Sequence, residues 1–172
     1  MSLQIRPAQD ADLSFIIDLM NHFIVHDPGL YSETAIRSEE AQAWMMARST
    51  ETSPMLVALS ASQIVGVAFA RPFRHQSGSA HVWESSVYLD PQSDVLRTGI
   101  GSRLLQSLLE QLSTQGTTEV IAVIDEDNRA SIQFHQKHGF LFVGAIQRAG
   151  FKFGRYRNAH LYQFSQNRSY YP

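Results

Sequence analysis

Two glycines mark a place in the sequence that suits an anion. Gly99 and Gly101 stand in the segment VLRTGIGSRLL (residues 95–105), after an apolar run typical of a strand and before one typical of a helix. Glycine is costly at a helix start unless the backbone bends unusually or approaches another group closely. Glycines there let backbone N–H groups point at a phosphate, which the helix dipole also favours. A plain tight turn would also explain this spacing of glycines, so a phosphate-binding loop and a simple turn both stay open. Neither a Walker loop nor a dinucleotide fingerprint is present.

A glutamate and a histidine are the candidates for acid–base chemistry. Glu84 lies inside the apolar segment HVWESSVYL, where strand alternation puts it on the same face as Ser86 and Tyr88. A carboxylate at such a place is either a general base or a residue that faces solvent. His135, in SIQFHQKHGF, lies about two helical turns after Asn128, which is expected to cap that helix. It is either an acid–base group or a structural histidine.

The basic residues form small groups that suit a small anion as well as solvent. One group is Arg71 with Arg74, and another lies within the segment GFKFGRYR. Arg74 is the candidate for bidentate binding of a carboxylate or phosphinate. The alternative is that Arg74 is a loop arginine that contacts only solvent. His22 and His26 have the spacing of a helical metal pair, but no third ligand is evident, so no metal is predicted. The absence of a Gly-x-Ser-x-Gly elbow argues against a hydrolase.

These side chains need a sheet and helices to hold them together, and hydrophobic periodicity predicts both. The expected strands are 3–8, 55–60, 64–73, 80–89, 119–125, 140–147 and 159–166. The expected helices are 13–26, 38–48, one that runs from the glycine pair to Gly116, and 129–138. A loop is expected at 148–158. The order β-α-α-β-β-β-α-β-α-β-β indicates a mixed α/β or α+β sheet rather than a doubly wound one.

Composition limits the classes of protein that fit. The 172 residues carry a formal net charge of −2 and include no cysteine. No broad attraction to nucleic acid follows from that charge, and no thiol nucleophile is available. No apolar run approaches the roughly 20 residues that span a bilayer, and no signal-peptide core is evident, so a cytoplasmic protein with no membrane partner is expected. The length predicts one domain over 1–166, with a C-terminal tail at 167–172.

The order of these motifs resembles the GNAT superfamily of acetyl-CoA-dependent N-acyltransferases. The strand SSVYLDP leads into the glycine loop, a leucine-rich helix leaves it, and the strand VIAVID is followed by NRASIQFHQKHGF. The segments PFR, VWESSVYL, SIQFHQKHGF and GFKFGR resemble the phosphinothricin N-acetyltransferase group. The resemblance runs from IRPA to FSQ. It implies the GNAT fold, a mixed and largely antiparallel sheet of about seven strands with about four flanking helices.

The resemblance also implies a role for each candidate residue. Glu84 would accept the proton of the acceptor amine, and His135 would protonate the departing thiolate of coenzyme A. The residues that would bind the amine substrate are Arg74, Tyr88, Lys152 and Arg155. The residues that would hold acetyl-CoA, used as a co-substrate, are Val87, Tyr88, Leu89, Arg97, Thr98, Gly99, Ile100, Gly101, Ser102, Asn128 and Ser131. Relatives of this kind imply a homodimer, with Lys152 and Arg155 near the cleft or the subunit interface.

One position departs from the superfamily pattern. The loop that binds the cofactor pyrophosphate has Gln or Arg where this chain has Leu96, with Arg97 one residue later. The backbone amides still suit a pyrophosphate, because their contribution needs no side chain. Either Arg97 or Arg103 replaces the missing contact, or the affinity for the cofactor is lower.

The sequence therefore predicts an enzyme that transfers acetyl from acetyl-CoA directly to the amino group of a small amino-acid-like substrate. Phosphinothricin, methionine sulfoximine and methionine sulfone are the expected type of substrate. Two alternatives remain open. One is a non-catalytic module that binds or senses acyl-CoA, which Leu96 favours. The other is an N-acetyltransferase for a polyamine, an aminoglycoside or a protein N-terminus, although the near-neutral charge argues against polycationic acceptors.

Overall fold

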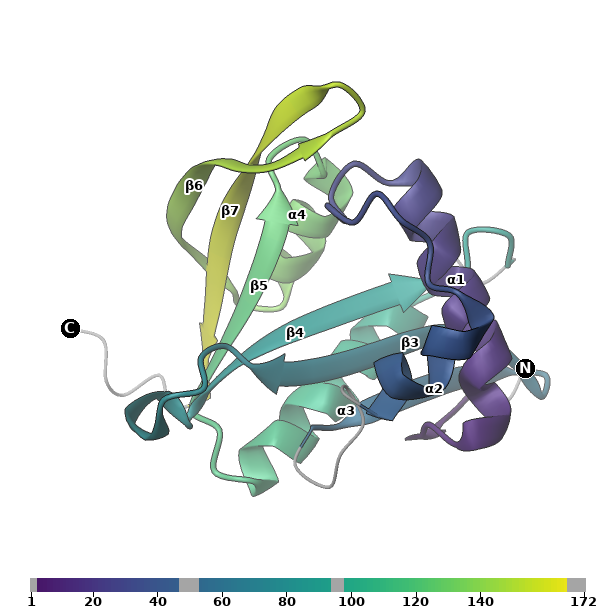
Figure 1. Cartoon of the computed structure of the whole chain (residues 1–172). Coiled ribbons are helices and arrows are strands. Elements are labelled where there is room, and N and C mark those ends of the chain that lie inside the picture. The colour runs from purple at the N-terminus through teal and green to yellow at the C-terminus, as the bar shows by residue number, and fades with distance from the viewer. Residues whose placement is uncertain (1–2, 47–52, 94–97, 167–172) are drawn as a thin grey trace.

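The computed structural model describes residues 3–46, 53–93 and 98–166, which form a seven-stranded sheet and four α-helices (Figure 1). The strands are β1 Leu3–Pro7, β2 Met55–Ser60, β3 Gln63–Pro72, β4 Val82–Leu89, β5 Glu119–Asp125, β6 Leu141–Lys152 and β7 Arg155–Ser165. The helices are α1 Leu13–His26, α2 Ser38–Met46, α3 Ile100–Thr114 and α4 Arg129–Lys137, with short 3-10 helices at Asp10–Asp12 and Ser77–Ser79. The predicted order of elements and the mixed sheet are confirmed.

The sheet opens at its centre. Its strand order is β1-β2-β3-β4-β5-β7-β6, and all neighbours are antiparallel except β4 and β5. These two parallel strands pair from Val82 with Glu119 to Glu84 with Ile121, and then separate (Figure 1). Among the described residues, the rest of β4 pairs with β3 but has no strand beside it on the β5 side. Backbone groups left free in this way suit a ligand that binds as a further strand.

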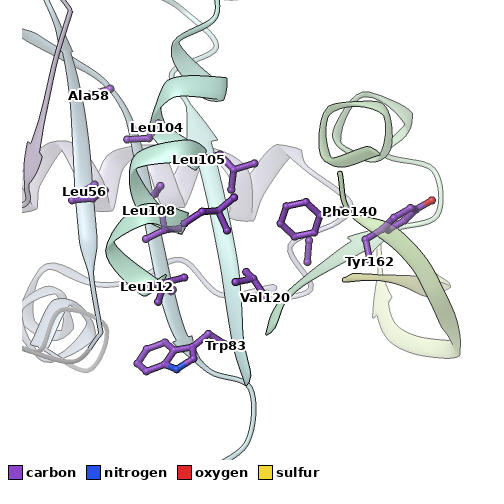
Figure 2. Packing of buried hydrophobic residues seen from close by; sticks show 14 of the residues in the cluster. Leu56, Ala58, Trp83, Leu104, Leu105, Leu108, Leu112, Val120, Phe140 and Tyr162 are labelled. Carbon is purple, nitrogen blue, oxygen red and sulfur yellow. The ribbon is translucent and has the colours of Figure 1, made fainter. Parts of the chain in front are cut away.

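Strand alternation divides the core between the two faces of the sheet. On one face, α1 and α2 pack over Val57, Val67 and Phe69. On the other face, the buried leucines of α3 pack mainly against β2, β3 and β4 (Figure 2). Members of this second cluster are Leu56, Ala58, Trp83, Leu104, Leu105, Leu108, Leu112, Val120, Phe140 and Tyr162. Full burial of one leucine side chain contributes about 2 kcal/mol. The leucine stripe therefore fixes α3, and with it the position of its N-terminus.

The two glycines at the start of α3 have different structural reasons. Gly99 is the N-cap and has a φ of +89°, and a Cβ placed there meets no atom within 4 Å. Gly101 lies in the first turn, where a Cβ would come 3.3 Å from Leu89 and 3.5 Å from Phe134. Gly99 is thus required by the left-handed backbone, and Gly101 by the close approach of α3 to β4 and α4. Gly116 follows the end of the helix, as predicted.

The C-terminal hairpin differs from the prediction. The prediction of a loop at 148–158 is wrong, because β6 and β7 occupy almost all of this segment. A two-residue turn at Phe153 and Gly154, with φ values of +52° and +76°, closes the hairpin, as in a type I′ turn. The register of β6 shifts between Ile146 and Gly150, which indicates a bulge. This irregularity breaks the alternation that would have indicated a strand.

The remaining element predictions are confirmed to within a few residues. The predicted continuation of the second helix to residue 48, the start of the glycine loop at 95–97 and the tail at 167–172 lie outside the described residues. None of the helices in the described ranges is long and apolar enough to cross a membrane.

Candidate active site

Two hollows meet along β4. The first, of about 440 Å³, lies on the face of β3 and β4 that α1 and α2 cover. The second, of about 140 Å³, lies where β4 and β5 separate. Residues that line both hollows are Gly29, Leu30, Ser86, Tyr88, Val123 and Asp125. A molecule bound in one hollow therefore lies beside a molecule bound in the other.

Glu84 lines the first hollow together with Ser86 and Tyr88, as the alternation along β4 predicts. Its two carboxylate oxygens lie 3.0 and 3.1 Å from Nη2 of Arg71. Arg71 stands opposite Glu84 in the register of β3 and β4. The Glu84 side chain is 17% exposed and the Arg71 side chain 54%. The ion pair can therefore be reached from the hollow, and so can the carboxylate by an incoming amine.

An apolar wall surrounds this ion pair. It is formed by α1, α2, the loop between them and β3, through Met20, Ile24, Ile36, Trp44 and Phe69. The loop also contributes the polar residues Tyr31 and Ser32. The first hollow thus places one acidic and one basic group beside apolar surface. This arrangement suits a small molecule that carries both charges and an apolar side chain.

Tyr88 lies at the junction of the two hollows. Its ring centroid is 5.0 Å from that of Phe23 and 6.1 Å from that of Phe69. Burial, followed by the nearby charges of Asp27 and Glu84, raises the pKa of Tyr88 to about 12. The phenol is therefore neutral at physiological pH and keeps a hydroxyl that donates a hydrogen bond.

His135 lines the second hollow from α4. Its Nδ1 lies 2.8 Å from the carbonyl oxygen of Ser131, one helical turn earlier. A carbonyl oxygen can only accept, so in the neutral ring Nδ1 carries the proton and Nε2 the lone pair. Burial lowers the pKa of His135 below 6.5, so the ring is neutral at physiological pH. In this state Nε2 of His135 can accept a hydrogen bond or a proton. It can donate a hydrogen bond only after it has gained a proton.

Two buried polar atoms of residues that line the second hollow lack a hydrogen-bond partner within the described chain. They are Oγ of Ser85 and Nε2 of His135. Ser85 is 5% exposed and His135 is 6% exposed. Buried polar atoms in folded proteins are nearly always paired with protein or water. The hydrogen-bonding capacity of these two atoms is thus available to a molecule in this hollow.

Asn128 caps α4, as predicted, because its Oδ1 accepts a hydrogen bond of 3.0 Å from the backbone N–H of Ser131. Asn128, Ser131 and Val87 all line the second hollow. Leu89, further along β4, packs toward Gly101 instead. Contact between these residues and acetyl-CoA stays a prediction.

The N-terminus of α3 offers backbone donors. Thr98 and Gly99 are exposed, Ser102 is half-buried, and no side chain caps this helix within the described residues. The first N–H groups of any helix have no acceptor inside it. The segment 98–102 that the sequence assigns to the cofactor thus lies at one helix end. Arg97, which belongs to the same prediction, lies outside the described residues, as does Leu96.

The structure does not bring Arg74, Lys152 and Arg155 to the described lining of either hollow, although the resemblance implies that they bind the substrate. Arg74 is exposed. Arg155 is also exposed and forms an ion pair of 2.7 Å with Asp127. Lys152 is 2% exposed and therefore meets solvent hardly at all.

Lys152 instead fastens the loop between α1 and α2 to the C-terminal hairpin. Its Nζ donates a hydrogen bond of 2.8 Å to the carbonyl oxygen of Asp27 and another to that of Leu30. Burial lowers the pKa of this ammonium group. Because Leu30 lines both hollows, Lys152 helps to set the position of their shared wall.

Tyr31 makes a second attachment of the same loop. Its hydroxyl lies 3.1 Å from the carbonyl oxygen of Asn158 and 3.3 Å from Oδ2 of Asp125. Burial, followed by the charge of Asp125, raises the pKa of Tyr31 to about 12. Asp125 is itself held by Arg157, whose side chain is 3% exposed. A Cβ on Gly150 would come 2.5 Å from the Tyr31 ring, so the hairpin and the loop are closely packed.

The role of Arg74 in binding the substrate stays a prediction, but Arg74 is not the arginine of its pair that lines the described cleft. Arg71, not Arg74, lines the first hollow. The available signal was the alternation along β3, which puts Phe69 and Arg71 on one face. Tyr31 and Ser85 were also missed, because nothing in the sequence shows what a loop hydroxyl or an inward-facing serine will meet. Within the described residues, no group of three or more His, Cys, Asp or Glu side chains is placed to hold a metal.

Comparisons with known proteins agree with this architecture. The profile of the Acetyltransferase (GNAT) family matches residues 17–140. An L-methionine sulfoximine/L-methionine sulfone acetyltransferase of Pseudomonas paraeruginosa is 35% identical over 157 residues, which cover 91% of this chain and 90% of the relative. A phosphinothricin N-acetyltransferase of Streptomyces coelicolor is 32% identical, with 94% of this chain and 95% of the relative covered.

Solved structures show the same similarity. A phosphinothricin acetyltransferase from Sinorhizobium meliloti, crystallised with AcCoA, has a TM-score of 0.86 and 30% identity, over 96% of this chain and 89% of that one. An N-acetyltransferase from Staphylococcus aureus has a TM-score of 0.90 and 28% identity, over 96% of this chain and 99% of that one. Profile, relatives and fold all agree with the motifs in the sequence. The chain therefore belongs to the GNAT family and is an N-acetyltransferase.

Proposed function

We propose that this enzyme transfers the acetyl group of acetyl-CoA directly to the amino group of a small amino-acid-like substrate, with both molecules bound at once. The observation that carries this proposal is the junction of the two hollows along β4, where Ser86 and Tyr88 line both. Glu84 lies on one side of the junction and His135 on the other. Holding two reactants in good alignment contributes about 7 kcal/mol or more to catalysis.

The second hollow and the start of α3 suit acetyl-CoA. The free backbone edge of β4 fits the amides of the pantetheine arm. The N–H groups at the start of α3 fit the pyrophosphate, which the helix dipole also favours. Structures of relatives from Sinorhizobium meliloti and Salmonella typhimurium hold acetyl-CoA, which supports this assignment. The described residues proposed to hold it are Val87, Tyr88, Leu89, Thr98, Gly99, Ile100, Gly101, Ser102, Asn128 and Ser131.

Glu84 is the proposed general base. At neutral pH the substrate amine is largely an ammonium ion, which has no lone pair for attack. Glu84 accepts one proton from it. The amine nitrogen then bonds to the carbonyl carbon of the thioester, and the bond between that carbon and sulfur breaks. The proton on Glu84 is released to solvent after the reaction.

His135 is proposed to move the second proton. After attack, the nitrogen still carries a proton that must leave before the amide forms. The neutral ring of His135 accepts through Nε2, as the hydrogen bond from Nδ1 to Ser131 dictates. It can then return this proton to the sulfur of coenzyme A, which leaves as a thiol. Acid–base assistance of this kind contributes roughly 10²- to 10⁴-fold.

The relatives point to the type of acceptor. Curated relatives act on methionine sulfoximine, methionine sulfone and phosphinothricin, and we propose that this enzyme takes an acceptor of the same type. The apolar wall of the first hollow, with its adjacent Glu84 and Arg71, supports that choice. We also propose a cytoplasmic location, where acetyl-CoA is available as a co-substrate.

The test of the proposed function is the variant Glu84→Gln. The amide keeps the size of the side chain but accepts no proton, so we expect kcat to fall roughly 10²- to 10⁴-fold. The KM for acetyl-CoA should change little, because Glu84 lies in the first hollow and not in the second. Release of free coenzyme A, followed with a thiol reagent and methionine sulfone as acceptor, measures both quantities.

Glu39→Gln is the matched control, because Glu39 is an exposed glutamate at the start of α2. It should leave both constants unchanged. If Glu84→Gln keeps the wild-type kcat across neutral pH, Glu84 is not the base. If the wild-type protein binds acetyl-CoA but acetylates no compound in a broad panel of amines, the protein is an acyl-CoA sensor instead.

We further propose that two chains pair through the C-terminal hairpin. Among the described residues, seven of the ten large apolar side chains that are exposed lie on β6, β7 or the turn between them. β6 is also an edge strand of the sheet. An exposed edge with this much apolar surface suits association with another protein surface. A second copy of the chain, which the resemblance implies, is the proposed partner.

A further inference from the structure

We propose that Ser85 is a positioning residue of the acetyl transfer. Its hydroxyl and Nε2 of His135 hold one water molecule between them, at the inner end of the second hollow. This water passes protons between His135 and the reacting atoms. The inference rests on the proposed function, because it concerns the path of the second proton. It adds a residue that the sequence did not assign.

Ser85 lies where β4 and β5 separate. Glu84 and Ile121 form the last pair between these two parallel strands in the described structure. Ser85 and Ala122 follow that pair, one on each strand, and both line the second hollow. Because both side chains are small, they leave room at the inner end of the gap.

Ser85 and His135 lie on the same side of the sheet. Alternation along β4 puts Ser85 on the face of Trp83, opposite to that of Glu84. Trp83 and Phe140 belong to one core cluster, and the ring centroids of Phe140 and His135 are 5.0 Å apart. His135 on α4 therefore lies over the face that carries Ser85, and the two residues line the same hollow.

The two polar atoms require a molecule between them. Oγ of Ser85 and Nε2 of His135 are buried and have no hydrogen-bond partner within the described chain, so they do not bond to each other. Buried polar atoms are nearly always paired, with protein or with ordered water. A water molecule takes up about 30 Å³ in the liquid, so a hollow of about 140 Å³ has room for one beside part of a ligand.

The chemistry of the two atoms selects water. Nε2 of the neutral ring can only accept, whereas the hydroxyl of Ser85 can donate and accept. The thioester of acetyl-CoA has no hydrogen to donate, so it cannot satisfy Nε2. A water molecule donates one hydrogen to Nε2 and accepts the hydrogen of the Ser85 hydroxyl. It keeps one lone pair and one hydrogen for the reacting atoms.

Protons pass through this water in two transfers. After attack, the amine nitrogen gives its proton to the free lone pair of the water while the water gives a hydrogen to Nε2. The electron pair of the broken N–H bond stays on nitrogen. Nε2 then returns a proton to the water, and the water gives one to the sulfur of coenzyme A as that sulfur leaves. The water is regenerated, and Ser85 holds it without gaining or losing a proton.

The experiment measures kcat and both KM values with methionine sulfone as acceptor. The variants are Ser85→Ala, Ser85→Thr, His135→Phe, and Ser85→Ala combined with His135→Phe. Phenylalanine fills the space of the imidazole but accepts no proton. Thr117→Val is the matched control, because Oγ1 of Thr117 is also buried without a partner in the described chain and lies outside the described lining of both hollows. Thermal unfolding checks that each variant is folded.

We expect Ser85→Ala to lower kcat roughly 3- to 10-fold, as the loss of one hydrogen bond does, and to leave the KM for acetyl-CoA unchanged. Ser85→Thr should restore kcat, because it keeps the hydroxyl. With His135→Phe already present, Ser85→Ala should have no further effect, because residues that act as a unit are not additive. Thr117→Val should change none of these constants. A crystal structure of the wild type should show a water about 3 Å from both atoms.

Three results overturn the inference alone: an unchanged kcat in Ser85→Ala, a higher KM for acetyl-CoA in its place, or an equal effect of Ser85→Ala with and without His135. The first makes the hydroxyl a structural feature, the second a contact of the cofactor, and the third a group that acts independently of His135. If His135→Phe is too slow to measure, the crystal structure and the comparison of Ser85→Ala with Ser85→Thr decide.

Failure of the proposed function gives a different result. A wild-type protein that acetylates neither methionine sulfone nor phosphinothricin overturns the proposed reaction. A wild-type kcat in His135→Phe overturns the proposed role of His135. Both results are seen before Ser85 is changed.

Discussion

The side chain of His135 shows how burial and one hydrogen bond decide the chemistry of a residue. Ser131 fixes the proton on Nδ1, and the apolar surroundings keep the ring neutral. A neutral imidazole whose Nε2 has no partner within the described chain accepts a proton before it gives one. The family resemblance alone implies an acid at this position. The geometry adds that this acid must first act as a base.

The same burial predicts how stability depends on pH. The unfolded chain binds a proton on His135 near pH 6.5, whereas the folded chain, with its lowered pKa, does so at a lower pH. Stability is therefore fully present above about pH 6.5 and falls as the pH drops toward the folded pKa, by at most about 1.4 kcal/mol per pH unit. Urea unfolding at about pH 7 and about pH 5.5 should show a smaller loss for His135→Gln than for the wild type. Equal losses would mean that the folded pKa of His135 is not lowered.

Part of the candidate site could be predicted from the sequence because its residues lie on regular elements. Alternation places Glu84 and Tyr88 on one face of a strand, and helical periodicity places His135 beyond the cap Asn128. Alternation along β3 separates Arg71 from Arg74, but the pairing of Arg71 with Glu84 depends on the register of β3 against β4. A loop of about nine residues joins these strands, and its length does not determine that register.

At the scale of elements, the C-terminal hairpin supports a loop that is distant in sequence. Lys152 and Tyr31 attach the segment between α1 and α2 to β6, β7 and the end of β5. The described part of that segment lines the first hollow on one side. Asp27, Gly29 and Leu30 of the same segment also line the second hollow, so a change in the hairpin should alter the binding of both the amine and acetyl-CoA.

Lys152→Met tests this coupling. Methionine fills similar space but leaves the carbonyl oxygens of Asp27 and Leu30 without their donor, which should cost about 2 to 3 kcal/mol of stability. The KM values for the amine and for acetyl-CoA should both rise, because Leu30 lines both hollows. Lys137→Met, which changes the other lysine of the chain in an exposed position on α4, is the control. A higher amine KM with no loss of stability would show that Lys152 contacts the substrate itself.

The hairpin is also where prediction of the fold failed. Continuous apolar runs and leucine periodicity identify β5 and α3, because packing on the sheet requires those patterns. Residues 148–158 show no such pattern, since the bulge after Ile146 interrupts the alternation and much of β6 is exposed. Strand pairing there depends on tertiary contacts such as that of Gly150 with Tyr31. A pattern within one segment does not contain that information.

At the scale of the whole molecule, the exposed hairpin predicts the oligomeric state. Leu141 is 68% exposed and Ile146 48%, and both lie on the edge strand β6. If two chains pair there, light scattering after size exclusion should give twice the chain mass of 19.4 kDa. The double variant Leu141→Lys with Ile146→Lys should give the mass of one chain, because burying two unpaired charges at an interface costs several kcal/mol.

Met46→Lys separates this effect from a general effect of added charge. Met46 is 65% exposed at the described end of α2. This helix packs over β2 and β3, which other strands separate from β6 in the sheet, so the replacement of Met46 should leave the mass doubled. Retention of activity by the monomeric double variant would show that the cleft is complete within one chain. A fall in activity that accompanies dissociation would instead indicate that pairing steadies the hairpin, and through Lys152 the wall of the first hollow. A wild-type protein that is monomeric at all concentrations would contradict the proposed dimer.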